Sequence, residues 1–115
     1  MNDRTLLELA ARAAGIKARW FKVNQWRRLD GCRLHIGQKN VFGTHHRKPW
    51  NPLTDDGDAL RLAVDAGILD GNAFSVWLNY RNGAMALEGL GAREATRLAF
   101  VRVAAEIGKS MGGTE

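Results

Sequence analysis

The chain has 115 residues, of which 45% are hydrophobic and 25% charged, and we expect residues 1–115 to form a single domain. This length leaves no room for separate cofactor and substrate domains. No apolar run approaches the roughly 18–20 residues that cross a bilayer, and the first residues lack the basic and apolar segments of a signal peptide. Because Cys32 has no second cysteine to pair with, we expect a reducing, cytoplasmic location.

The net charge of +5 is unevenly distributed along the sequence. Residues 12–48 contain ten Lys and Arg side chains and one acid, Asp30, whereas residues 55–70 contain five Asp and one Arg. Such an asymmetry steers an anionic partner toward the basic side of a protein. A solvated basic surface without any partner explains the same charges, and charge alone gives the two interpretations equal weight.

The N-terminal residues predict a helix that ends at Gly15. Asn2 or Asp3 can cap it, and Thr5 and Glu8 have the capping-box spacing just before an apolar run. Gly15 suits the left-handed residue that commonly follows a helix. We interpret this helix as structural.

Residues 16–48 are predicted to form strands joined by a hairpin turn at Asp30-Gly31, because both turn positions tolerate positive φ. Four cross-strand pairs follow from this turn: Leu29 with Cys32, Arg28 with Arg33, Arg27 with Leu34, and Trp26 with His35. One face then carries Trp26, Arg28, Arg33 and His35. Like charges directly opposite each other are unfavourable unless something neutralises them, which points to a bound anion.

The segment 43–52 contains two prolines and no periodic pattern, so it is predicted to be a surface loop. A second helix follows, with Thr54 as its expected N-cap and two aspartates in the first turn, where the helix dipole favours negative charge. Gly67 is the expected terminator. The expected buried positions of this helix are Leu60, Ala63, Val64 and Ile68.

Residues 73–88 are predicted to form a second β-hairpin. Apolar and polar residues alternate up to Asn82-Gly83, a dipeptide typical of a type I′ turn. Pairing across that turn places Tyr80 opposite Met85 on a core face. The other face carries Trp77, which is therefore expected to be an exposed aromatic residue.

A last helix is predicted over about residues 92–110 from apolar residues at helical spacing, and residues 112–115 are predicted to be a frayed tail. The expected order is helix, strands, helix, β-hairpin, helix. The fold class is therefore α+β, with an antiparallel sheet packed by helices.

Three stretches resemble a known family. They read LLELAA and AGI within residues 6–16, WNPLTDDGDALRLAV over residues 50–64, and ATR followed by VRVAAEI within residues 95–107. Together they cover about half of the chain and are similar to small phage and prophage proteins of the NinX-like domain-of-unknown-function group, with the middle stretch the most specific. The resemblance implies a phage or prophage accessory protein with no established catalytic residue.

The segment between Trp20 and Lys48 departs from this family in being longer and more basic, so a function specific to this chain can lie there. By analogy, small phage accessory proteins often inhibit host factors or defence systems, either by binding an effector or by sequestering a nucleotide signal.

Two histidines and three aspartates form the only group that suggests metal chemistry: His45, His46, Asp55, Asp56 and Asp58. Carboxylates suit magnesium or manganese and imidazole suits zinc. The aspartates at 55 and 56 are already explained by the start of a helix, and the spacing matches no defined metal site. We therefore expect no metal, no cofactor and no catalytic residue, and a metal-dependent hydrolase is the least favoured alternative.

Aromatic side chains interleaved with bases are the strongest functional signal. Aromatic rings stack on nucleobases and arginine pairs with phosphates, although tryptophan and arginine are equally enriched at protein interfaces. For Trp20 and Trp50 we favour a place in the core. The candidate binding residues are Trp26, Arg27, Arg28, Arg33, His35, His45, Arg47, Lys48, Trp50 and Trp77.

The sequence therefore predicts a non-catalytic, phage-encoded protein that inhibits or sequesters a host target. That target is expected to be a nucleotide signal or an acidic surface of a defence protein, contacted by the basic segment 17–50. The alternative is a nucleic-acid-binding accessory protein that contacts phosphates through Arg and Lys of residues 19–48. No membrane partner is expected, and the exposed face around Trp77 is equally suited to a homodimer.

Overall fold

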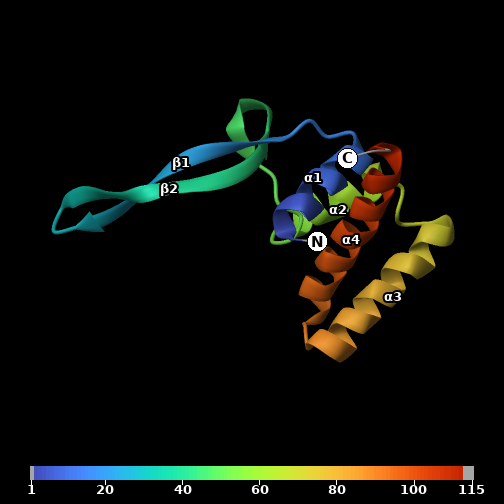
Figure 1. Cartoon of the computed structure of the whole chain (residues 1–115). Helices are drawn as coiled ribbons and strands as arrows, with labels where there is room; N and C mark the ends of the chain where they lie inside the picture. The colour runs from blue at the N-terminus through green and yellow to red at the C-terminus, as the bar shows by residue number, and fades with distance from the viewer. Residues whose placement is uncertain (1, 113–115) are drawn as a thin grey trace. The chain divides into compact units, whose positions relative to one another are not determined.

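The computed structural model describes residues 2–112, and Figure 1 shows the elements in chain order. The elements are α1 (Asp3–Ala14), β1 (Arg19–Leu29), β2 (Cys32–Thr44), a 3-10 turn (His45–Arg47), β3 (Lys48–Pro49), α2 (Asp56–Asp65), α3 (Gly71–Glu88) and α4 (Ala92–Gly112). The three strands form one antiparallel sheet in the order β1-β2-β3. The predicted α+β class is confirmed. Of the predicted tail, Gly112 ends α4, and residues 113–115 lie outside the described part of the chain.

The chain divides into two units by its internal contacts. A helical unit comprises residues 1–17 and 51–115, and a β unit comprises residues 18–50. The single-domain organisation of residues 1–115 stays a prediction. Among residues 2–112, no helix combines the length and apolarity that a membrane crossing requires.

The first helix, α1, follows the prediction closely. The Asn2 side chain accepts a hydrogen bond from the backbone amide of Thr5 at 2.8 Å, so Asn2 is the N-cap. Gly15 has φ 70°, and its amide donates to the last carbonyls of the helix. A left-handed residue of this kind satisfies carbonyl groups that a helix end otherwise leaves unpaired.

The second helix, α2, is capped and buried differently from the prediction. Its N-cap is Asp55, whose carboxylate accepts from the amide of Asp58 at 2.7 Å, so Thr54 was the wrong choice by one residue. The expected buried residues Leu60 and Val64 are 55% and 59% exposed. The expected burial of Ala63 and Ile68 is confirmed, since both are fully buried. The helix also buries Ala59 and Leu62. The sequence offers two overlapping apolar stripes, and the stripe with small residues lets α2 approach α4 closely.

The predicted hairpin over residues 73–88 is wrong, because Gly71–Glu88 forms the helix α3. A helix satisfies its own backbone hydrogen bonds, whereas an isolated two-stranded hairpin is marginal in water. Trp77 and Ala84, two helical turns apart, then lie on the side that packs against α4. This packing outweighs both the alternating pattern and the cost of about 1 kcal/mol for glycine at position 83 inside a helix.

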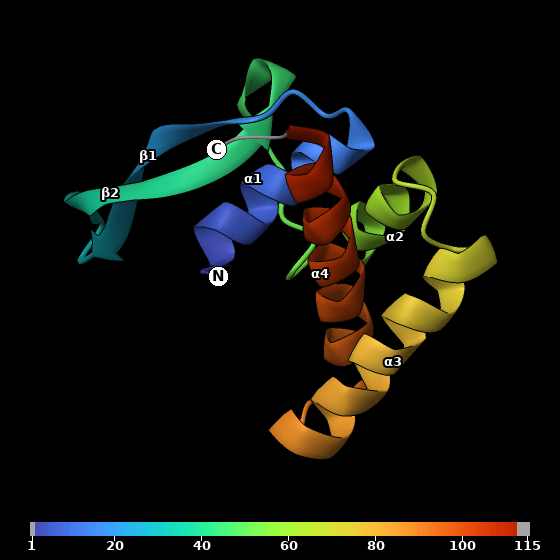
Figure 2. The ribbon, with the colours of Figure 1, turned by 45° about the vertical axis from the view of Figure 1, so that its right-hand side comes forward.

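The last helix, α4, confirms the prediction and forms the centre of the helical unit. It contacts α1, α2 and α3, and Figures 1 and 2 show it lying between α1 and α3. Small residues, among them Ala95, Ala99 and Ala104, are fully buried along it. Near its C-terminal end, a Cβ added to Gly108 would overlap the carbonyl group of Leu9. The backbones of α1 and α4 therefore touch at this glycine.

The hairpin of β1 and β2 has the predicted turn and the predicted pairing. Asp30 and Gly31 have φ 49° and 78°, as a two-residue turn with two left-handed positions requires. The four pairs nearest the turn are those expected from the sequence, including Trp26 with His35 and Arg28 with Arg33. A β-bulge interrupts the ladder beyond them, between Gln25 and Trp26.

The segment predicted to be a loop after β2 contains a short strand. β3 pairs with the end of β2, so that Gly43 lies opposite Pro49. The amide of Trp50 donates to the Phe42 carbonyl at 2.8 Å, and the Trp50 ring lies 5.9 Å from that of Phe42. Trp50 is only 5% exposed, which confirms the core position favoured for it and contradicts its place among the binding residues.

Candidate functional site

The exposed ribbon formed by β1 and β2 contains most of the predicted binding residues. Every residue from 22 to 36 is exposed. With 11 residues in β1, at about 3.4 Å per residue, the ribbon is roughly 35 Å long. Figure 1 shows it as a twisted pair of strands. A two-stranded ribbon buries little surface of its own, so nearly all its side chains are available to a partner.

One face of the ribbon brings aromatic and polar side chains together around Trp26. The Arg33 guanidinium carbon lies 4.7 Å from the centroid of the Trp26 ring. The His35 ring meets the same indole edge-on, with a centroid distance of 5.1 Å. Trp26 is nevertheless 48% exposed. Arg28, directly opposite Arg33 in the ladder, completes the set of four residues that the turn predicted.

Two amide side chains extend this face, and the sequence interpretation missed them. Asn24 Oδ1 accepts a hydrogen bond from Gln38 Nε2 at 3.0 Å and lies 3.2 Å from His35 Nε2. Residues 35 and 38 are three apart, so in a regular strand they would point to opposite faces. The bulge, which leaves Ile36 without a cross-strand partner, turns both toward Asn24. Gly37, at φ 130°, was the available signal, because an isolated glycine within a strand often marks a bulge.

We call this surface the Trp26 face. Its members are Asn24, Trp26, Arg28, Arg33, His35 and Gln38.

The charge of the β unit is strongly one-sided. Residues 18–50 contain eight bases, Arg19, Lys22, Arg27, Arg28, Arg33, Lys39, Arg47 and Lys48, against the single acid Asp30, a net charge of +7. None of these bases forms an ion pair with another residue in the described range 2–112. The helical unit, with nine bases and eleven acids, has a net charge of −2. Uncompensated positive charge is therefore a property of the ribbon and its adjoining turn.

The opposite face of the ribbon mixes bases with apolar side chains. Val23, Leu29 and Leu34 are between 39% and 53% exposed there. Arg27, predicted to bind a partner, alternates with these residues along the strands and lies on this second face. It is exposed but is not part of the group around Trp26.

The predicted residues after β2 have mixed environments. The rings of His45 and His46 lie 4.0 Å apart, and both side chains are exposed. Arg47 donates to the backbone carbonyl of Lys22 at 2.8 Å and lies over the Phe21 ring, so its guanidinium braces the ribbon. Lys48 is exposed on β3.

Trp77 is partly buried in the helical unit and is not an exposed aromatic residue. Its ring packs edge-on against Phe100 of α4 at 4.9 Å and against Phe74 at 5.3 Å. Its indole Nε1 is buried without a hydrogen-bond partner among the described residues. The exposed position predicted for Trp77 is therefore wrong, because the segment is a helix whose inner side carries this ring.

The three aspartates considered for metal binding each have a structural partner. Asp55 caps α2. Asp56 forms ion pairs with Arg97 at 2.6 Å and Arg93 at 3.6 Å. Asp58 accepts from the amide of Asn51 at 2.9 Å and pairs with an arginine of its own helix. Within residues 2–112, no group of three or more His, Cys, Asp or Glu side chains could hold a metal ion.

Comparisons of the chain with models of protein families, with curated proteins and with solved structures found no match. The resemblance to NinX-like phage proteins stays a prediction. The chemistry of the ribbon is therefore the main evidence that bears on function.

Proposed function

We propose that this chain is a non-catalytic nucleic-acid-binding protein that contacts a duplex through the β1–β2 ribbon. The observation that carries the proposal is a group of eight bases on and beside an exposed ribbon that also presents the Trp26 face. None of these bases forms an ion pair among the described residues. Lysine and arginine side chains that neutralise phosphates supply most of the affinity of proteins for nucleic acids.

The dimensions and the residue types of the ribbon suit a nucleic-acid groove. The major groove of B-form DNA, about 12 Å wide, accommodates a two-stranded β-ribbon. On the Trp26 face, the Asn24 and Gln38 amides are the groups that pair with adenine edges, and arginine is the group that pairs with guanine. We expect other bases of the ribbon to contact phosphates, which orient a protein on the duplex.

An open face supports a polymeric partner better than a single nucleotide. Sites for small molecules usually bury 70–90% of their ligand in a concave pocket. The Trp26 face is exposed along its whole length, and the ribbon is several times longer than one nucleotide. The function predicted first from the sequence, sequestration of a host nucleotide signal, has less support from this geometry.

A phage or prophage origin and an inhibitory action on host defence are part of the same proposal. They rest on the three resembling stretches, and a duplex-binding ribbon is compatible with them. An acidic protein surface is the competing partner, since it would recognise the same bases without using the Asn24 and Gln38 amides.

The proposal is tested by fluorescence anisotropy with labelled 20-base-pair DNA, single-stranded DNA of the same length, duplex RNA and poly-L-glutamate. We expect the DNA duplex to bind most tightly, with log Kd rising against log salt at a slope of roughly 5–7 for six to eight phosphate contacts. Equal affinity for poly-L-glutamate would favour an acidic protein as the partner. Absence of duplex binding at about 100 mM salt would overturn the proposal.

A further inference from the structure

Helix α3 has a line of residues whose spacing is typical of helix pairing. Val76, Tyr80, Gly83 and Leu87 follow one another at intervals of four, three and four, the spacing of the a and d positions at which one helix packs against another. We call these four residues the α3 seam. Trp77 and Ala84 face α4, and the seam lies beside that contact, with Tyr80 bordering residues of α4. Leu87 is 88% exposed.

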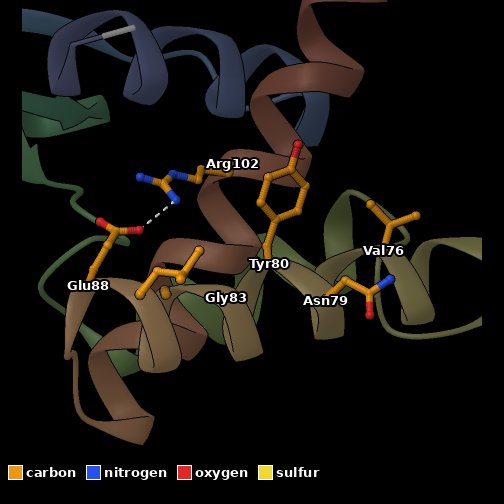
Figure 3. A pocket seen from close by; sticks show the side chains of 8 residues that line it. Val76, Asn79, Tyr80, Gly83, Glu88 and Arg102 are labelled. Atoms are coloured by element: carbon orange, nitrogen blue, oxygen red, sulfur yellow. Dashed lines mark hydrogen bonds and ion pairs between the residues drawn. The ribbon is translucent and has the colours of Figure 1, made fainter.

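The seam borders a hollow in the helical unit. A cavity of about 450 Å³ is lined by the seam together with Asn79, Ala84, Glu88 and Arg102. Figure 3 shows Tyr80 between Val76 and the ion pair that Arg102 forms with Glu88 at 3.3 Å. A contiguous apolar surface of this kind is a candidate interaction site.

The seam itself carries no charge. Helix α3 contains only two charged side chains, Arg81 and Glu88, and both contact residues of α4: Arg81 Nε donates to Thr96 Oγ1 at 3.1 Å, and Glu88 pairs with Arg102. The surface of a partner that covers the seam must therefore also be apolar and uncharged.

We infer that the partner is a second copy of this chain, with the two α3 helices packed antiparallel about a two-fold axis. In the pairing centred between Tyr80 and Gly83, Tyr80 of each copy faces Gly83 of the other, and Leu87 faces Val76. Large side chains thus meet small ones at every step of the seam. A Cβ built on Gly83 meets nothing within 4 Å, so this position is not filled by a side chain of the same copy. A self-complementary patch of this kind is what a two-fold interface requires.

The exposed area of the seam limits the affinity of the dimer. Val76, Tyr80 and Leu87 are 44%, 39% and 88% exposed, and the surface that they offer lies at or below the roughly 500 Å² per copy of the smallest specific interfaces. We therefore expect a weak dimer. The dimer is independent of the ribbon, since the seam belongs to the helical unit and the ribbon to the β unit. Neither proposal depends on the other.

Sedimentation equilibrium of the full chain tests the inference, between about 5 and 500 µM protein, with salt near 300 mM to screen the charges of the ribbon. We expect a monomer–dimer equilibrium for the wild type. Leu87→Glu should raise the dimer dissociation constant at least about 30-fold, because it places a carboxylate in an apolar contact on each copy. Leu60→Glu is the matched control, since Leu60 is 55% exposed on α2, outside the seam, and it should dimerise as the wild type does.

Three outcomes would overturn the inference: a wild type that stays monomeric throughout the range, Leu87→Glu protein that dimerises like the wild type, or equal loss of dimer in both variants. Because Leu87 is almost fully exposed, circular dichroism should show that its replacement leaves the helices intact. A ribbon variant, Arg28→Glu with Arg33→Glu, should dimerise normally. Loss of the dimer in that variant would place the interface on the ribbon.

Discussion

Arg33 stacks over Trp26 across the ribbon, with its guanidinium carbon 4.7 Å from the ring centroid, although its partner in the ladder is Arg28. A cation over the face of an indole is attracted by the negative charge of the ring's π-system. The contact therefore offsets part of the repulsion between the two arginines. The Arg28–Arg33 pair is therefore stabilised in part by a contact within the protein. The presence of this pair alone does not require a bound anion.

Charge reversal on the Trp26 face should abolish nucleic-acid binding. We expect Arg28→Glu with Arg33→Glu to weaken duplex binding at least about 100-fold at 100 mM salt, because two phosphate or base contacts become repulsive. Both residues are exposed, so the urea midpoint should change little. Anisotropy titration and urea unfolding of the same preparation measure the two effects.

The matched control for this variant lies in the helical unit. Arg93 and Lys109 are exposed on α4, and Arg93→Glu with Lys109→Glu changes the net charge by the same amount. We expect this control to weaken binding less than about tenfold, through long-range charge alone. If the two double variants lose affinity equally, the effect is one of net charge, and the ribbon has no special role.

Two tryptophans should respond in opposite ways to alanine. Trp26→Ala should weaken nucleic-acid binding by roughly 1–3 kcal/mol, the loss typical of an aromatic contact to a base, and change stability little, since Trp26 is half exposed. Trp77→Ala should cost about 3 kcal/mol of folding free energy, because it removes a ring packed against Phe100. Anisotropy titration measures the loss of binding, and guanidinium unfolding measures the stability of both variants. A stable Trp77→Ala protein would contradict the packing of α3 against α4.

The contact between α1 and α4 predicts that alanine is harmful at position 108. Helix propensity alone favours Gly108→Ala by about 1 kcal/mol, but the new methyl group would overlap the Leu9 carbonyl. We therefore expect a net loss of about 1–3 kcal/mol, as overpacking usually causes. Gly83→Ala is the comparison: its Cβ meets nothing within 4 Å, so in the monomer it should stabilise α3. Urea unfolding at low micromolar protein should give opposite signs for the two variants.

The N-cap of α2 can be assigned by a pair of substitutions. Asp55→Ala should destabilise the protein by about 1 kcal/mol, because it removes the carboxylate that accepts from the Asp58 amide. Thr54→Ala should change stability by less than about 0.5 kcal/mol, as a surface substitution without a capping role does. The same unfolding assay applies. A larger loss for Thr54 would restore the cap expected from the sequence.

Turn dipeptides in the sequence correctly predicted the β1–β2 hairpin but wrongly predicted a hairpin where α3 forms. Asp30-Gly31 allows few turns other than a two-residue hairpin, so the register beside it followed directly. Asn82-Gly83 is an equally good turn signal. The helical conformation of residues 73–88 is nevertheless favoured, because it lets Trp77 pack on Phe100 of α4. Periodicity cannot show such a contact. Gln38 was missed for a related reason, because the bulge in β2 changes which of its side chains share a face. Asn24 lies two residues from Trp26 on β1, so strand alternation alone places it on the same face.

The outer edge of β1 has no strand partner in the sheet, which leaves a row of backbone amide and carbonyl groups open to pairing with another molecule. Proteins commonly protect such edges from aggregation with charged side chains, lysine above all. The bases at 19, 22, 27 and 28 lie along β1 and are suited to this purpose. The charge of the ribbon therefore opposes strand pairing between chains, apart from its part in the proposed binding of nucleic acid. Neutral residues at these positions would leave the edge of β1 unprotected.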